Sequence, residues 1–332
     1  MTDIKPIDLK SPPSNLKATV DFHLVFPQEL QKKLKNKIFD TSPKERASEW
    51  KKINLDIDKV SNSFKEMLKE RNNFAYDKGF SSRLVMALDW FKIPENDYKK
   101  FTNNIDKIIH LCNLQLPKFD KLPPSFYSEF NIPCFICQIF KFPLKTTDEA
   151  FNYIVKGNKV LNKFKYKINI KSGSESKTIY KKELDNFEIT INKSVNPRHQ
   201  ITDLIHELSH VIVYLQNFKK ETNLLDKGVY LREKEAIKIE TEILRSLSAD
   251  LYKAVLLGET LALIFRTLFE IEIYKNPNQN LEKLYAKIFN KCYKTANQKT
   301  NPMFFLDERI IFSPFSSLPY AVVNVNMLLS AR

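Results

Sequence analysis

Two histidines four residues apart are the side chains in this sequence that are best placed to do chemistry. His206 and His210 enclose Glu207 in the pattern His-Glu-x-x-His. Apolar residues recur every three or four positions from Ile201 to Leu215, which predicts a helix. Both imidazoles would lie on one face of that helix. Two imidazoles at this spacing can hold one Zn²⁺, and Glu207 can take a proton from water that the metal activates.

The alternative is that two unrelated histidines fall at this spacing by chance. The chain has only 5 histidines, so a chance match to the whole pattern is rare and the metal interpretation is favoured. A catalytic zinc site also needs a third protein ligand. No histidine follows His210, so a site of three imidazoles would draw on His23, His110 or His199.

A carboxylate is the more plausible third ligand. Four glutamates lie on a second predicted helix, which follows a loop containing Gly228: Glu233, Glu235, Glu240 and Glu242. The two helices are expected to pack as an antiparallel pair, which would bring one of these carboxylates to the histidines.

A short β region precedes the histidine helix. The residues at 164–170, 177–180 and 187–192 predict three short strands. The last strand leads directly into the helix. Its free edge could pair with an extended peptide and lay the scissile bond over the metal, which makes Ile189, Thr190 and Ile191 the expected substrate-binding residues. An ordinary edge strand remains the alternative.

The rest of the chain is expected to be helical. It has 332 residues, 43% of them hydrophobic, and only 5 glycines, which argues against a turn-rich β fold. Apolar stripes and helix start signals predict helices over most of 27–111 and again from Thr147. We expect a flexible arm at 1–20, a helical lobe at 21–145 and a catalytic domain at 146–332, with the two lobes packed as one unit.

The net charge of +14 raises the question of an anionic partner. Most lysines alternate with acids along predicted helices, which indicates solvated faces, and no nucleic-acid partner is expected. Electrostatic steering could still favour acidic peptides or an acidic partner protein.

The sequence predicts a soluble protein. The longest apolar run, at 254–265, is broken by Glu259 and is too short for a membrane span. The first residues lack the apolar segment of a signal peptide, so we expect the protein in the cytoplasm, or secreted without such a signal, for example as an effector. The 4 cysteines, among them Cys134 and Cys137, are expected to be buried free thiols.

The residues around the histidines resemble the zinc oligopeptidase family that includes thimet oligopeptidase and the oligoendopeptidase F group. In that family a glutamate ligand follows the second histidine, and another glutamate lies seven residues further on. Glu235, at 25 residues after His210, and Glu242 match those positions here. The lead-in strand at 187–192 and the segment at 313–322, which ends in Tyr320-Ala321-Val322, are similar to family segments as well. The resemblance extends over about 60–332.

The resemblance implies a mainly α, zincin-like (gluzincin) catalytic domain with a small sheet beside the active-site helix. The implied activity is that of a zinc metalloendopeptidase acting on peptides or proteins. One Zn²⁺ would be held by the two histidines and Glu235, and Glu207 would be the general base. Tyr320 would donate to the oxyanion. Glu242 would orient a ligand, unless it is a solvated helix acid.

The chain departs from the family in three places. Ser209 stands where family members usually have glycine, so helix packing there must differ slightly. Family chains are typically much longer. A shortened helical lobe would leave the substrate channel more open and relax the limit to short peptides. Ser316 and Ser317 replace a stretch rich in histidine and tyrosine, which leaves Tyr320 as the expected donor.

Two other functions stay open at this point. A protease that a pathogen delivers to cut one host protein would fit the short lobe and the Lys-, Asn- and Ile-rich composition. The other is a basic binding protein without catalytic activity, whose zinc is structural or has been lost. Against it, structural zinc usually has four protein ligands, and Glu207 would have no task.

Overall fold

The computed structural model describes residues 22, 57–115, 143–173, 176–181, 184–193, 197–218, 228–293, 304 and 307–330. Within these ranges the chain is mainly helical and has one three-stranded sheet, which confirms the predicted mainly α class. The chain divides into two compact units, which are formed by 1–131 with 261–321 and by 132–260 with 322–332. No helix in the described ranges is long and apolar enough to cross a membrane.

This division differs from the predicted one. We expected 146–332 to form a single domain, but residues 261–321 belong to the unit of the N-terminal helices. The boundary falls inside helix α12 (Ala249–Lys275). Helical periodicity continues through this boundary, so the sequence pattern carries no sign of it. The predicted arm at 1–20 lies outside the described residues.

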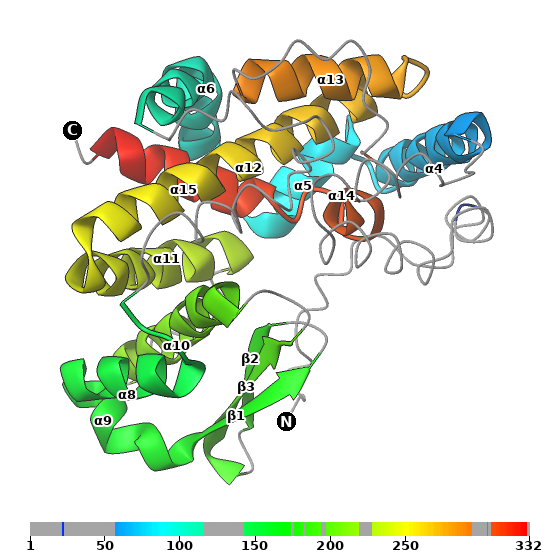
Figure 1. Cartoon of the computed structure of the whole chain (residues 1–332). Coiled ribbons are helices and arrows are strands. Elements are labelled where there is room, and N and C mark those ends of the chain that lie inside the picture. Colours follow the sequence, from blue (N-terminus) through cyan, green and yellow to red (C-terminus); the bar gives the residue numbers. More distant parts are fainter. Residues whose placement is uncertain are drawn as a thin grey trace. The chain divides into compact units, whose positions relative to one another are not determined.

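The first unit consists of helices in its described part (Figure 1). They are α4 (Ile57–Asp77), α5 (Arg83–Phe91), α6 (Glu95–Gln115), the C-terminal part of α12, α13 (Leu281–Cys292), α14 (Glu308–Phe312) and the start of α15 (Leu318–Ser330). Aromatic side chains fill the space between α12 and α13. Phe265 and Phe269 meet the ring of Tyr285 edge-on, with ring centroids 4.9 and 5.0 Å apart.

A polar network is buried in the first unit. Glu270 is 1% exposed, and its Oε1 accepts a hydrogen bond from the backbone N–H of Phe315 at 2.5 Å. Arg266 donates to Asp307 at 2.8 Å beside it. Burial is the main reason why the pKa of Glu270 is raised to about 8, and the nearby Asp307 carboxylate raises it further. The Phe315 N–H, Arg266 and Arg71 act in the opposite direction and lower this pKa. Glu270 is therefore a neutral acid at neutral pH.

Replacing Glu270 by Gln is expected to remove part of the pH dependence of stability. The pKa of Glu270 is about 8 in the folded chain, against its ordinary value of 4.5, so folding takes up a proton between these values. This stabilisation is complete below the ordinary pKa and is lost as the pH rises through the folded one. In the pH range between these two pKa values, each unit of rising pH should lower the free energy of unfolding of the wild type by up to about 1.4 kcal/mol relative to that of the variant.

Urea unfolding of both proteins at acid, neutral and mildly alkaline pH measures this difference. Other titrating groups are common to the two proteins and cancel. A constant difference across the pH range would show that folding does not shift the pKa of Glu270.

The second unit carries the sheet and the histidine helix. Its strands are β1 (Ile168–Gly173), β2 (Lys177–Lys181) and β3 (Asn186–Asn192), in the order β1-β3-β2. The central strand β3 runs parallel to β1 and antiparallel to β2. All three predicted strands are present. The first begins at residue 168 rather than 164, because α9 ends at Phe164 and 165–167 form a 3₁₀ turn.

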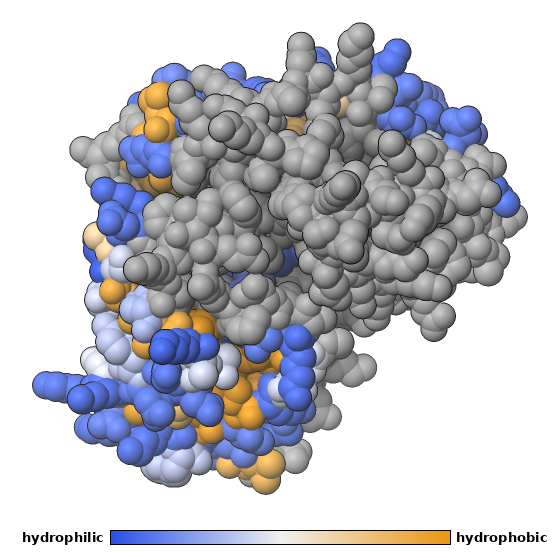
Figure 2. All heavy atoms as spheres, in the orientation of Figure 1, coloured by the Kyte–Doolittle hydropathy of each residue, from blue (hydrophilic) through white to orange (hydrophobic). Residues whose placement is uncertain are grey.

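The helices of this unit are α8 (Thr147–Gly157), α9 (Lys159–Phe164), α10 (Pro197–Phe218) and α11 (Gly228–Leu247), together with the start of α12 and the end of α15. Helix α10 packs against α8, α11 and β3 (Figure 1). The described surface over α8, α9 and the sheet is mostly hydrophilic, with a patch of apolar residues among the polar ones (Figure 2).

The core of the second unit lies between α10 and the sheet. The apolar stripe of α10 is fully buried, as its helical period predicts: Ile201, Leu204, Ile205, Leu208, Val211 and Ile212. Phe187, Ile189 and Ile191 of β3 join the same core. Because strand side chains alternate, Glu188 and Thr190 lie on the other face of the sheet. This packing fixes the rotation of α10 about its axis and so decides where its histidines point.

Candidate metal centre

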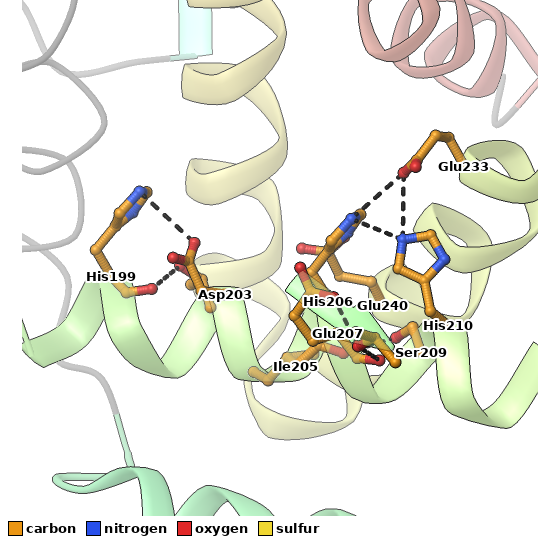
Figure 3. Close-up of polar contacts among 11 residues, drawn as sticks. His199, Asp203, Ile205, His206, Glu207, Ser209, His210, Glu233 and Glu240 are labelled. Carbon is orange, nitrogen blue, oxygen red and sulfur yellow. Dashed lines mark hydrogen bonds and ion pairs between the residues drawn. The ribbon is translucent and has the colours of Figure 1, made fainter. Parts of the chain in front are cut away.

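His206 and His210 face each other from consecutive turns of α10, with their Nε2 atoms 3.2 Å apart (Figure 3). Glu233 on α11 reaches both rings, because α11 packs along α10. Its Oε2 lies 3.4 Å from the Nε2 of His206 and 3.4 Å from that of His210. The three possible ligand atoms all lie within 4.8 Å of one another. We refer to His206, His210 and Glu233 as the His-His-Glu cluster.

Glu240 fixes the orientation of one of the rings. It lies two turns beyond Glu233 on α11, and its Oε2 is 2.8 Å from Nδ1 of His206. A carboxylate at this nitrogen favours the tautomer with the proton on Nδ1. The Nε2 lone pair of His206 is then directed into the cluster.

The cluster has the donor set of a zinc site. Glu233 Oε2 is buried, and it lies 3.4 Å from the two imidazole nitrogens without the geometry of a hydrogen bond to any described residue. A buried carboxylate oxygen needs a compensating charge or donor, and a cation between the three side chains would supply it. Two imidazoles and one carboxylate occur together in catalytic zinc sites, which leave a further position for water or substrate.

The electrostatic field of the site favours positive charge at the cluster. Burial acts to lower the pKa of His206, but the carboxylates of Glu240 and Glu233 outweigh it and hold this pKa well above its ordinary value. Burial also acts to raise the pKa of Glu233, and His210 and His206 overcome it and hold this pKa well below the ordinary value. The two carboxylates therefore stabilise a cation between the helices.

Glu207 occupies a different environment although it follows His206 directly. It is 7% exposed, and its Oε2 accepts a hydrogen bond from the Thr178 hydroxyl at 2.7 Å. Burial raises the pKa of Glu207, while His206, His210 and the Thr178 hydroxyl oppose this rise. A carboxylate whose pKa is raised is suited to take up a proton and release it again near neutral pH.

The structure places Glu233 and Glu240 beside the histidines, rather than the predicted Glu235 and Glu242. Glu235 and Glu242 are exposed, whereas Glu233 and Glu240 are 7% and 8% exposed and contact the histidines. The buried face of α11 is the one with the apolar residues Val229, Tyr230, Ala236, Ile237 and Leu244. At 100° per residue, a shift of two positions turns a side chain to the opposite face. The spacing of seven residues between the two acids is the same in both pairs.

The predicted substrate-binding strand is also corrected. Ile189, Thr190 and Ile191 are buried on β3, which pairs with β1 on one side and β2 on the other. A strand with both edges paired cannot accept a further peptide strand. Within the described part of the chain, β2 pairs with β3 alone and lies at the edge of the sheet next to α10.

The remaining candidates lie apart from the cluster or are not placed against it. Tyr320 is half-buried on α15, in the first unit, and its role stays a prediction. His110 is exposed on α6 in that unit. His199 lies near the start of α10, beside Asp203 and outside the cluster. His23 is outside the described residues.

Ser209, where the resemblance leads one to expect glycine, is 0% exposed. Its hydroxyl donates to the carbonyl oxygen of Ile205, one turn earlier on α10, at 2.8 Å. The helix itself thus satisfies the buried hydroxyl, and the additional side chain leaves no unpaired donor in the core.

Comparison with solved structures shows the fold. A crystal structure described as a candidate oligoendopeptidase F matches 95% of this chain and 66% of its own length, with a TM-score of 0.58 and 11% sequence identity. A candidate oligoendopeptidase F from Bacillus anthracis matches 89% of this chain and 58% of its own, with a TM-score of 0.53 and 13% identity. No family model and no curated protein matches the sequence. The chain has the helical fold of these structures and spans less than two thirds of their length.

Proposed function

We propose that the chain is a zinc metallopeptidase that hydrolyses peptide bonds. The observation that carries the proposal is the convergence of His206, His210 and Glu233, with the carboxylate of Glu207 on the same turn of α10 as His206. The fold supports it, because the solved structures that share the fold are named as oligoendopeptidases.

In the proposed site the Nε2 atoms of His206 and His210 and a carboxylate oxygen of Glu233 would hold a zinc ion. The ion would supply Lewis acidity towards the substrate carbonyl and towards water. Glu207 accepts a proton from the attacking water and passes it to the leaving amine. Glu240 holds His206 in the tautomer that presents Nε2.

The edge of β2 that pairs with no strand in the described part of the chain is the proposed place for an extended substrate. β2 lies beside α10, and its Thr178 contacts Glu207. A peptide that paired with β2 through main-chain hydrogen bonds would therefore pass next to the general base. Tyr320 remains the proposed donor to the oxyanion, a role worth roughly 10²–10³ in rate in comparable sites.

Replacing Glu240 by Gln is expected to weaken zinc binding without removing a ligand. The neutral amide holds the His206 ring less firmly and no longer adds negative charge beside the metal, so zinc affinity should fall roughly 10- to 100-fold. Competition with a fluorescent chelator measures this affinity. Glu242→Gln is the matched control, because Glu242 is on the same helix but exposed. Equal affinities for the two variants would contradict the role given to Glu240.

Incubation of the zinc-loaded protein with a mixed peptide library, read by mass spectrometry, tests the proposed function. New peptide termini should accumulate, and a chelator should prevent them. Cleavage that is insensitive to the chelator would contradict a zinc mechanism. A protein that binds zinc and leaves every peptide intact would contradict peptidase activity.

A further inference from the structure

Two hydroxyl–carboxylate hydrogen bonds fasten the edge of the sheet to α10. Ser176, directly before β2, donates to Asp203, and Thr178 on β2 donates to Glu207. Two residues of a strand advance about 6.6 Å, and four residues of a helix advance about 6.0 Å. These steps match, so both hydroxyls can meet carboxylates on consecutive turns of α10. Ser176 also accepts a hydrogen bond from the backbone N–H of Asn192 at 3.0 Å, which ties the start of β2 to the end of β3.

The bond from Thr178 holds one oxygen of Glu207 and leaves the other available. Thr178 Oγ1 is 2.7 Å from Oε2 of Glu207 and 3.1 Å from the main-chain carbonyl oxygen of the same residue. The hydrogen bond from the Thr178 hydroxyl engages Oε2 and not Oε1. Because Thr178 is opposite Ile189 in the sheet register, its side chain lies on the face that packs against α10. The sheet therefore sets the position of this hydroxyl.

We infer that Thr178 is a positioning residue whose hydroxyl sets the orientation of the Glu207 carboxylate. This inference rests on the proposed function, in which Glu207 is the general base. Without the hydroxyl, Oε2 would lose its donor in a buried place and the carboxylate would turn towards another one. The strand proposed to align the substrate would thus also align the base with it.

Three threonine variants test the inference. Thr178→Val keeps the shape of the side chain but removes the hydroxyl, and we expect kcat to fall roughly 10- to 100-fold. KM should change by less than about threefold, because the main chain of β2 remains to pair with the substrate. Thr178→Ser restores the hydroxyl and should bring kcat back to within about threefold of the wild type.

Thr190→Val is the matched control. Thr190 lies on β3, both of whose edges are paired, and its buried hydroxyl has no hydrogen-bond partner in the part of the chain that the structure describes. It faces away from α10, so kcat should stay at the wild-type value. Zinc affinity should be unchanged in all three variants, since neither threonine contacts the His-His-Glu cluster. Thr178→Ala replaces Thr178→Val if the latter does not fold.

The outcomes separate this inference from the proposed function. If the wild type cleaves peptides and Thr178→Val keeps the wild-type kcat, the inference is overturned and the peptidase stands. If Thr178→Ser is as slow as Thr178→Val, the methyl group rather than the hydroxyl matters, and the inference is again overturned. A wild type that binds zinc but cleaves nothing overturns both.

Discussion

Replacing Glu207 by Gln is expected to reduce peptide hydrolysis to a small residual rate while zinc stays bound. The amide has nearly the shape of the carboxylate and can still accept the hydrogen bond from Thr178, but it cannot take a proton from water. General bases contribute about 10²–10⁴ in rate, and kcat should fall by that factor. Glu207 lies outside the His-His-Glu cluster, so zinc stoichiometry should equal that of the wild type.

Kinetics on a peptide from the library, together with zinc analysis of the same samples, measure both properties. Glu207→Asp is an informative companion, because it keeps the charge and moves it back by one methylene. Its rate should lie between those of the wild type and Glu207→Gln. If Glu207→Gln retained the wild-type kcat, Glu207 would not be the base. If it lost zinc, Glu207 would belong among the ligands.

Replacing Glu233 by Gln should remove zinc and activity together. The carboxylate of Glu233 supplies the negatively charged ligand of the cluster, and the amide is a weak substitute for it. The loss in zinc affinity should exceed the roughly 10- to 100-fold that the loss of a supporting contact costs. Hydrolysis at limiting zinc should disappear.

Glu235→Gln provides a close control for this prediction. It makes the same chemical change two residues further along the same helix, on the exposed side. Zinc affinity and kcat should both match those of the wild type. A result in which Glu235→Gln lost zinc and Glu233→Gln kept it would show that α11 sits in the register first expected from the sequence.

The acids predicted to serve the site and those that the structure places beside the histidines differ by two residues on α11, and this difference has a physical origin. The sequence shows pairs of acids seven residues apart at 233 with 240 and at 235 with 242. Family-like spacing from His210 selected the second pair, but this spacing depends on the length of the connection between the helices. The apolar positions of α11 are a better guide, because Tyr230, Ile237 and Leu244 repeat with the same period and face the core. Glu233 and Glu240 interrupt that stripe.

Features set by local periodicity could be predicted from the sequence. The buried stripe of α10 requires the helix and places His206 and His210 together on its other side. Features that depend on tertiary pairing could not be predicted from the sequence. β3 leads into α10 and so seemed to be the substrate strand, yet β2 folds back and takes the edge. Thr178 gives no local signal at all, because a threonine is ordinary in any strand.

The metal centre is tested most directly by anomalous diffraction at the zinc edge from crystals of the zinc-loaded protein. We expect one strong peak within bonding distance of His206 Nε2, His210 Nε2 and a carboxylate oxygen of Glu233, with Glu240 hydrogen-bonded to His206 behind it. A peak bonded to Glu235, or zinc bound elsewhere with none between α10 and α11, would contradict it.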